Sequence, residues 1–294
     1  MKFTKPALSA EQQIELWKSR GLIVENDKEA AHYLTFIGYY RLSGYALPLT
    51  CKIRPEIHKF RDGATFSRIL ELYCFDRELR LLVMDAIERI EVAFRTCVSN
   101  ALAAKYGPHW YLNTNCGCFD HVRDFHDFGK KVAEEVGFDE FGSGKRRGRD
   151  VFIEHYFSKY TDPRLPPTWM IAEVLSITAW SKCFGNLRRG DQKLISEKFG
   201  MNPEVMESWM HSLCYVRNLC AHHARLWNRE FTIRPKIAHA YSKELGDNSK
   251  FFAQAFVIKV LLERISPGSR WWGRLEDHLL ANRFVDRAAM GFPN

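Results

Sequence analysis

The sequence lacks a long uninterrupted apolar run. Its most apolar stretch, residues 170–187, is broken by the charged residues Glu173 and Lys182, whereas a helix that crosses a bilayer needs about 20 consecutive apolar residues. The first ten residues are polar and lack the apolar segment of a signal peptide. These absences predict a cytoplasmic protein without a membrane segment.

A metal-binding cysteine pattern is also missing. The chain has 8 cysteines but no CxxC pair, and the close pair Cys116 and Cys118 has no second half or histidine partner nearby. A structural zinc site needs four convergent ligands, so we expect no metal and no cofactor. Scattered free thiols indicate a reducing compartment.

The sequence shows no convincing alternation of apolar and polar residues typical of strands, and no internal repeats. Its charged residues are not balanced, because positive charges are in excess. Lys and Arg total 43 against 35 Asp and Glu, which gives a net charge of +8. A basic surface favours anionic partners, nucleic acid first. Hydrophobic residues make up 46% and aromatic residues 14% of the chain, enough to build a core.

Helical periodicity is what the sequence offers instead. Apolar residues recur at steps of three to four between residues 65 and 105, the spacing of one buried helical stripe. Forty helical residues would extend roughly 60 Å, so we expect a break near the start of this helix. Further helices are predicted at residues 9–20, 28–36, 121–137, 168–187, 200–225, 250–265 and 274–283.

The predicted fold class is therefore all-α. We expect an N-terminal helical segment over residues 1–60 packed on a helical bundle over residues 61–240. A C-terminal helical extension would follow over residues 241–294.

The densest cluster of polar functional groups lies in residues 215–229 (YVRNLCAHHARLWNR). On a helical wheel, Asn218 and His222 share the face opposite an apolar stripe, and Arg217 lies to the side of that stripe. His223 lies close to the stripe, so a structural role is predicted for it.

Arg217, Asn218 and His222 are chemically suited to RNA cleavage. A histidine transfers protons near neutral pH, a guanidinium holds a phosphate and stabilises developing charge, and an amide fixes either group. This chemistry requires no metal. The alternative from the residues alone is a helix end whose polar groups are structural.

Arg217 to His222 resembles the R-polar-xxx-H motif of HEPN ribonucleases, and the surrounding residues resemble the signature of Abi-like (AbiD/AbiF, abortive infection) proteins. Further segments resemble the same family in the same order: residues 36–45 (FIGYYRLSGY), 75–80 (FDRELR), 87–95 (IERIEVAFR) and 166–173 (PPTWMIAE). The resemblance covers about residues 10–235.

The resemblance implies a HEPN-like up-and-down bundle that forms a homodimer, in which Arg217, Asn218 and His222 of both copies line one cleft. It also implies supporting roles for Glu91, which would orient Arg217, and for Arg95, which would contact the phosphate. The alternative for Glu91 and Arg95 is an ordinary intrahelical ion pair worth a few tenths of a kcal/mol.

Other basic and aromatic residues are candidates for RNA binding. The loop at residues 142–148 (GSGKRRG) and the residue after it would contact a phosphate backbone electrostatically through Lys145, Arg146, Arg147 and Arg149. Tyr39 and Arg41 would stack on unpaired bases. The alternatives are a solvated loop and packing of the turn between two helices.

The function predicted from these observations is a toxin-like, metal-independent RNA endonuclease of phage defence. A cognate small structured non-coding RNA, implied by the resemblance, would control it. A non-catalytic RNA-binding defence protein that grips such an RNA with the same surface is the alternative. A helical interaction protein with a purely structural Arg–His cluster is a third possibility.

Overall fold

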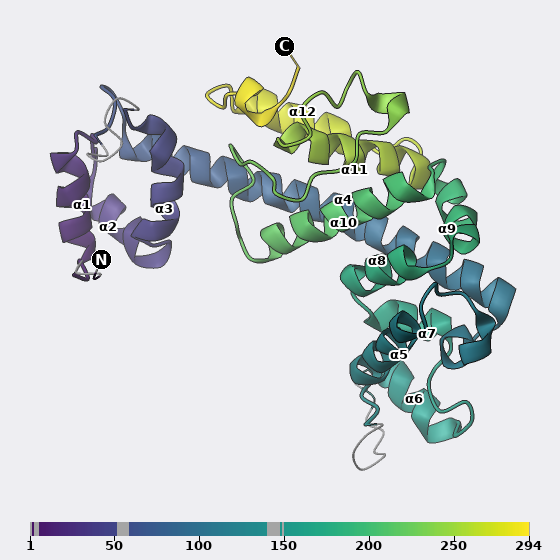
Figure 1. Cartoon of the computed structure of the whole chain (residues 1–294). Helices are drawn as coiled ribbons and strands as arrows, with labels where there is room; N and C mark the ends of the chain where they lie inside the picture. The colour runs from purple at the N-terminus through teal and green to yellow at the C-terminus, as the bar shows by residue number, and fades with distance from the viewer. Residues whose placement is uncertain (1, 3–5, 52–58, 140–147, 149, 294) are drawn as a thin grey trace. The chain divides into compact units, whose positions relative to one another are not determined.

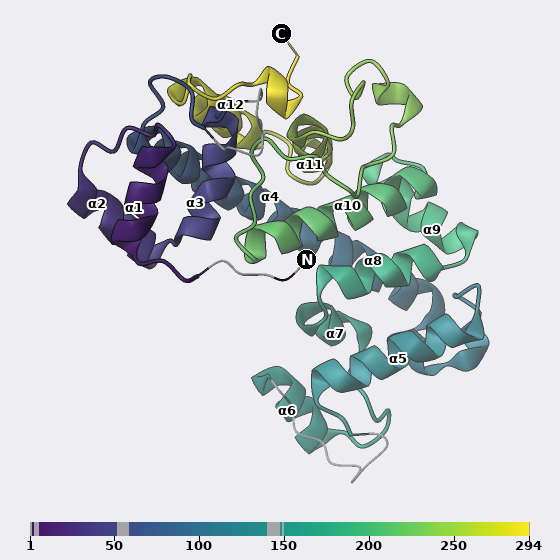
Figure 2. The ribbon, with the colours of Figure 1, turned by 60° about the vertical axis from the view of Figure 1, so that its left-hand side comes forward.

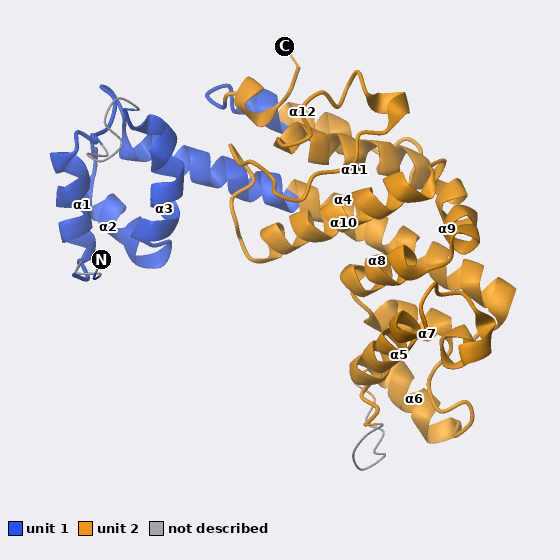
Figure 3. Ribbon diagram, viewed as in Figure 1, with its two compact units in different colours: residues 1–81, 278–285 blue, residues 82–277, 286–294 orange. Residues whose placement is uncertain are grey.

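The computed structural model describes residues 2, 6–51, 59–139, 148 and 150–293, and its regular structure there is helical, with isolated β-bridges but no strand. The all-α prediction is confirmed. The chain divides into two compact units, residues 1–81 with 278–285 and residues 82–277 with 286–294 (Figure 3). Among the described residues, no helix combines the length and the hydrophobicity needed to cross a membrane.

The first unit contains α1 (Ala10–Ser19), α2 (Asp27–Phe36), α3 (Tyr39–Ala46), η1 (Leu47–Leu49) and the first part of α4 (Phe66–Tyr106). Helix α1 begins at a capping box, because the Ser9 side chain accepts a hydrogen bond from the Gln12 backbone and the Gln12 side chain accepts one from the Ser9 backbone. The core of this unit includes the buried side chains of Trp17, Leu42 and Phe75.

A buried polar network ties α3 to α4 in this unit. The hydroxyl of Tyr45 donates to Asp76 Oδ2 at 2.6 Å, and Arg80 forms an ion pair with the same carboxylate. All three side chains are buried. A carboxylate in such an environment is stable only when it is paired and hydrogen-bonded, so the network fixes how α3 packs on α4.

The second unit contains the remainder of α4 and most of the other helices. In chain order these are η2 (Trp110–Leu112), η3 (Thr114–Cys116), α5 (Val122–Val136), α6 (Val151–Lys159), α7 (Thr168–Val174), α8 (Ile177–Asn186), α9 (Arg189–Ser196), η4 (Glu197–Phe199), α10 (Pro203–Ala221), η5 (His239–Tyr241), α11 (Phe251–Ile265), the first part of α12 (Trp271–Ala281) and η6 (Ala288–Met290). The last turn of α12, from His278 on, belongs to the first unit.

Within the second unit, α10 packs against α8, α9 and α11, while α5 packs against α7 and α8 (Figures 1 and 2). Phe94 of α4 contacts the rings of Phe184 in α8 and Phe199 in η4. Helix α11 is buried on nearly all its faces, because its residues 251–258 and 260–262 are all buried.

Two expectations about the helices before α10 were wrong. Helix α4 runs without the expected break from Phe66 to Tyr106. The aromatic stretch after Gly38, for which packing of a turn between two helices was one alternative, is itself helix α3. The helix expected over residues 168–187 is two helices, because Leu175 and Ser176 are extended and the Ser176 side chain caps α8 by accepting from the Ala179 N–H.

Candidate functional site

Helix α10 carries the polar motif and is held firmly in the second unit. Asn202 caps its start and Pro203 occupies its first position. The indole of Trp209 donates to the carbonyl of Lys236 at 2.9 Å, and the hydroxyl of Ser212 donates to Gln254 Oε1 of α11 at 2.7 Å. The motif at its other end therefore projects from an anchored scaffold.

The helix ends at Ala221, four residues earlier than predicted, in a Schellman motif. His222 is the cap, and His223 adopts a left-handed conformation with φ of 56°. The N–H of His223 bonds to the Cys220 carbonyl at 3.0 Å and that of Ala224 to the Leu219 carbonyl at 2.8 Å. The left-handed position of a Schellman motif usually holds glycine. Because histidine stands there in this sequence, the end of the helix could not be recognised from the sequence.

The structure brings Arg217, Asn218 and His222 to one end of α10, outside the core. Arg217 is half-buried, while Asn218 and His222 are exposed. The backbone N–H of His222 bonds to the Asn218 carbonyl at 3.0 Å, which fixes the two residues one turn apart. Within the described part of the chain, none of these three side chains forms a hydrogen bond or ion pair, so all three remain available to a ligand.

The position of His223 differs from the expectation that it lies at the core edge. It is exposed, because the helix has already ended before it. Its backbone closes the Schellman motif.

Glu91 of α4 lies beside the same region of the unit. Its Oε1 atom accepts a hydrogen bond from the backbone N–H of Ile177, the first residue of α8, at 3.1 Å. A carboxylate at this position satisfies a free N–H group of the helix and interacts favourably with its dipole. Glu91 thus holds the start of α8.

Arg95, one turn further along α4, forms an ion pair with Glu173 of α7 at 2.5 Å. The side chain of Arg95 is only 16% exposed, and its Nε atom is buried without a hydrogen-bond partner among the described residues. Glu91 and Arg95 are not paired with each other there. The two residues instead bracket the junction between α7 and α8.

Cys214 is a site residue that the sequence analysis missed. Burial raises the pKa of its thiol, hydrogen bonds with Thr178 and Ser181 lower it, and the charges of Glu91 and Arg217 act on it with opposite signs. Cys214 therefore lies within electrostatic reach of both charged groups. The sequence signal that could have identified Cys214 is its position about one helical turn before Arg217.

Tyr215 is a second missed residue. Burial alone would raise the pKa of its hydroxyl, but hydrogen bonds with Thr232 and Arg229 outweigh burial and lower the pKa. The Arg229 guanidinium donates to Tyr215 Oη at 3.4 Å. This contact binds the segment after the motif back onto α10.

The residues expected to contact RNA elsewhere are not brought to this site. Lys145, Arg146, Arg147 and Arg149 lie outside the described residues. In the first unit, the Tyr39 ring packs on Trp17 with centroids 4.8 Å apart and its hydroxyl accepts from Arg20. This contact supports the packing alternative for Tyr39, while Arg41 is exposed.

Among the described residues, no group of three or more His, Cys, Asp or Glu side chains is arranged to hold a metal ion. The groups that the α10 site offers are an imidazole, a guanidinium and an amide. Together they provide proton transfer, binding of an anion and a neutral hydrogen-bonding group.

Comparison with known proteins identifies one family. No curated protein and no solved structure matches the chain. The sequence profile of a family described as Abi-like protein matches residues 32–228, which include α10 and the whole motif. More than half of the chain is covered, and the protein belongs to the Abi-like family.

Proposed function

We propose that this protein is a toxin-like, metal-independent RNA endonuclease of phage defence, with Arg217 and His222 as catalytic residues. Its family is named for abortive infection, a form of phage defence. The observation that carries the proposal is the presence of Arg217, Asn218 and His222 at the end of an anchored helix, without side-chain partners among the described residues.

The reaction that these groups suit is internal attack by the ribose 2′-oxygen on the adjacent phosphorus. The P–O5′ bond breaks, which leaves a 2′,3′-cyclic phosphate and a 5′-hydroxyl. His222 moves the proton, either from the 2′-hydroxyl or to the leaving oxygen. Arg217 binds the phosphate and stabilises its developing charge, while Asn218 positions the imidazole or the phosphate.

A homodimer is part of the proposal. Arg217 and His222 are five positions apart, which separates them by about 140° around the helix axis at 100° per residue. One copy is therefore poorly arranged to clamp and deprotonate the same nucleotide. A two-fold pair would place two copies of each group around one cleft.

Glu91 and Arg95 support this site in the proposal. In the proposal, the negative charge of Glu91 orients Arg217. The Arg95 guanidinium, held by Glu173, would release this partner to contact a phosphate. A cognate small structured RNA is proposed to control the enzyme.

The deciding experiment uses an RNA oligonucleotide and its matched analogue with a 2′-deoxy sugar at the cleaved position. We expect wild-type protein to cut the RNA in excess EDTA and to leave cyclic phosphate ends. The deoxy analogue should bind but remain intact. His222→Ala and Arg217→Ala should abolish cleavage, while the control His211→Ala, an exposed histidine on the same helix, should retain it. Cleavage of the deoxy analogue would remove His222 from its assigned role.

The second candidate function is RNA binding without catalysis. It is favoured by the separation of Arg217 and His222 around the helix, which suits two independent contacts to a strand. In that case RNA would bind to the wild type and remain uncut under every condition tested, and Arg217→Ala would weaken binding.

A further inference from the structure

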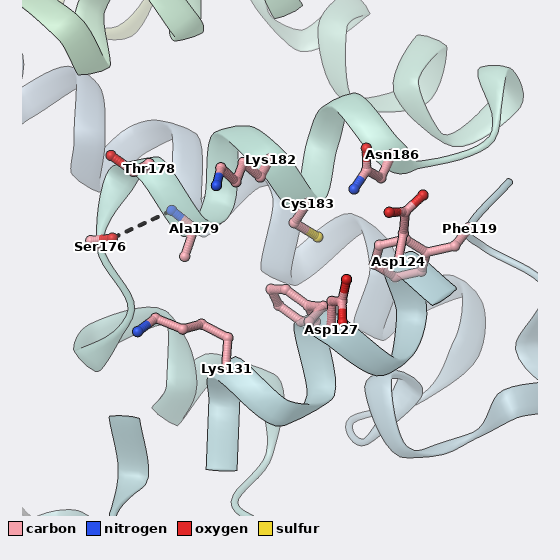
Figure 4. A pocket seen from close by; sticks show the side chains of 11 residues that line it. Phe119, Asp124, Asp127, Lys131, Ser176, Thr178, Ala179, Lys182, Cys183 and Asn186 are labelled. Atoms are coloured by element: carbon pink, nitrogen blue, oxygen red, sulfur yellow. Dashed lines mark hydrogen bonds between the residues drawn. The ribbon is translucent and has the colours of Figure 1, made fainter. Parts of the chain in front are cut away.

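A pocket of about 570 Å³ lies between α5 and α8 in the second unit (Figure 4). None of the proposed catalytic residues lines it. Its volume lies within the roughly 300–1,000 Å³ typical of sites for small organic ligands. The pocket is therefore a candidate binding site separate from the end of α10.

The pocket carries opposite charges on two sides. Figure 4 shows the amines of Lys131 and Lys182 on the side that holds the first turn of α8. The carboxylates of Asp124 and Asp127 and the amide of Asn186 lie on the other side. A ligand that fills the pocket must present an anion at one end and hydrogen-bond donors at the other.

One charged group on each side has no ion-pair partner within the described part of the chain. Lys131 pairs with Glu135 at 2.8 Å, and Asp127 lies 3.7 Å from Arg123. Lys182 and Asp124, in contrast, form no ion pair there and do not pair with each other. Asp124 also lies in the first turn of α5, where the helix dipole favours a carboxylate. Lys182 and Asp124 are thus the charges most available to a ligand.

Part of the pocket wall is apolar and aromatic. Phe119 and Phe128 line the pocket, with ring centroids 6.0 Å apart, and Ala179 of α8 adds a small apolar surface. The Phe128 ring is stacked on Trp110 at 5.3 Å, which holds it in place. A flat heteroaromatic ring would contact this wall with little reorganisation of the protein.

We propose that this pocket binds a nucleotide, with guanine as the preferred base. The phosphate would bind the Lys182 ammonium, and the base would lie against the Phe119 and Phe128 wall. Guanine carries two adjacent donors, N1–H and the 2-amino group, which match the two oxygens of the Asp124 carboxylate. The Asn186 amide would donate to the guanine O6 atom.

The nucleotide has two chemically equivalent sources. It is either a free mononucleotide or a single unpaired nucleotide of an RNA strand, because both present the same base and a phosphate. The proposal does not depend on RNA cleavage, since the pocket residues and the catalytic residues are different.

Equilibrium binding to the purified full-length chain tests the pocket. The probes are GMP, AMP, guanosine and a five-nucleotide RNA with one central guanine. We expect GMP to bind about tenfold more tightly than guanosine, because Lys182 contributes a charge-assisted bond of about 1.4 kcal/mol. AMP, which cannot donate twice to Asp124, should also bind more weakly than GMP.

Matched variants assign the binding to the pocket. Lys182→Gln should make GMP bind no better than guanosine, and Asp124→Asn should remove the preference over AMP. Lys193→Gln, an exposed lysine on α9 outside the pocket, should bind GMP as the wild type does. His222→Ala should do the same, which separates this site from the proposed catalytic one.

Each outcome decides the matter. Tighter binding of GMP than of the RNA identifies a free nucleotide as the ligand, and tighter binding of the RNA identifies a strand. The proposal is overturned if wild-type protein binds neither, or if Lys182→Gln and Asp124→Asn, with unchanged circular dichroism, bind GMP as the wild type does.

Discussion

The carboxylate of Glu91 in α4 accepts a hydrogen bond at 3.1 Å from the backbone N–H of Ile177, the first residue of α8. This contact joins two segments that are 86 residues apart in the chain. It gives Glu91 a structural role, in addition to the supporting role that we propose for it in RNA cleavage. Two substitutions of Glu91 distinguish these two roles.

Glu91→Ala should lower the free energy of unfolding by about 0.5–2 kcal/mol, the usual cost of losing a helix cap. Glu91→Gln retains an acceptor oxygen without the charge, so it should cost much less in urea denaturation. If the charge supports Arg217, both variants should cleave RNA more slowly. The control Glu88→Ala changes an exposed residue of the same helix and should affect neither property. Equal loss of stability in Glu91→Gln and Glu91→Ala would contradict the capping role.

Substitution of His223 should reveal the cost of its left-handed backbone conformation. Its φ of 56° is unfavourable for a β-branched residue. His223→Val should therefore destabilise the protein by about 1–2 kcal/mol relative to His223→Asn, because Asn tolerates the left-handed region. Both variants lack the imidazole, so the difference between their thermal denaturation curves isolates the backbone effect. Identical curves would argue against the Schellman motif.

The buried pair of Arg80 and Asp76 should be intolerant of losing one partner. Arg80→Met leaves the carboxylate of Asp76 in the core without its cation, which should cost about 3–5 kcal/mol. Arg77→Met alters an exposed arginine of the same helix and should stay within about 0.5 kcal/mol of the wild type. Chemical denaturation measures both, and a mild effect of Arg80→Met would contradict the prediction that Asp76 depends on this cation.

Stability at alkaline pH should depend on Lys105. Its ammonium pairs with the buried Asp191 at 2.6 Å, and this hydrogen bond raises the pKa of Lys105 above its ordinary value of 10.5. A raised pKa in the folded state stabilises the protein fully below the unfolded value, and the contribution disappears as the pH rises through the folded value. The stability difference between wild type and Lys105→Met should therefore be constant up to about pH 10 and shrink above it. A difference that grows with pH would have the wrong sign.

The apolar periodicity of the long helices made them predictable from the sequence. The stripe through Ile90, Phe94 and Val98 of α4 is fully buried. Apolar residues at this spacing lie on one face only when the segment is an α-helix. The break between α7 and α8 was hidden because apolar residues continue through Leu175 and Ile177. Ser176 was the sole capping signal, and serine is common inside apolar helices as well.

The candidate site was predictable only where it depends on residues of one helix. Spacing alone placed Asn218 and His222 together outside the core. It gave no information about Glu173 and Ile177, which bind Arg95 and Glu91 across 78 and 86 residues. Such contacts depend on how helices pack, and a one-dimensional pattern does not contain that packing.

The nearly complete burial of α11 has a genetic consequence. This helix begins at Phe251, beyond residue 228 where the family match ends, yet its Gln254 side chain accepts the hydrogen bond of Ser212 inside α10. A frameshift or stop codon that removes α11 would remove one of the helices that pack against α10, which carries Arg217 and His222. Alleles truncated after codon 240 should therefore behave as complete loss of function, although they encode every residue of the family signature.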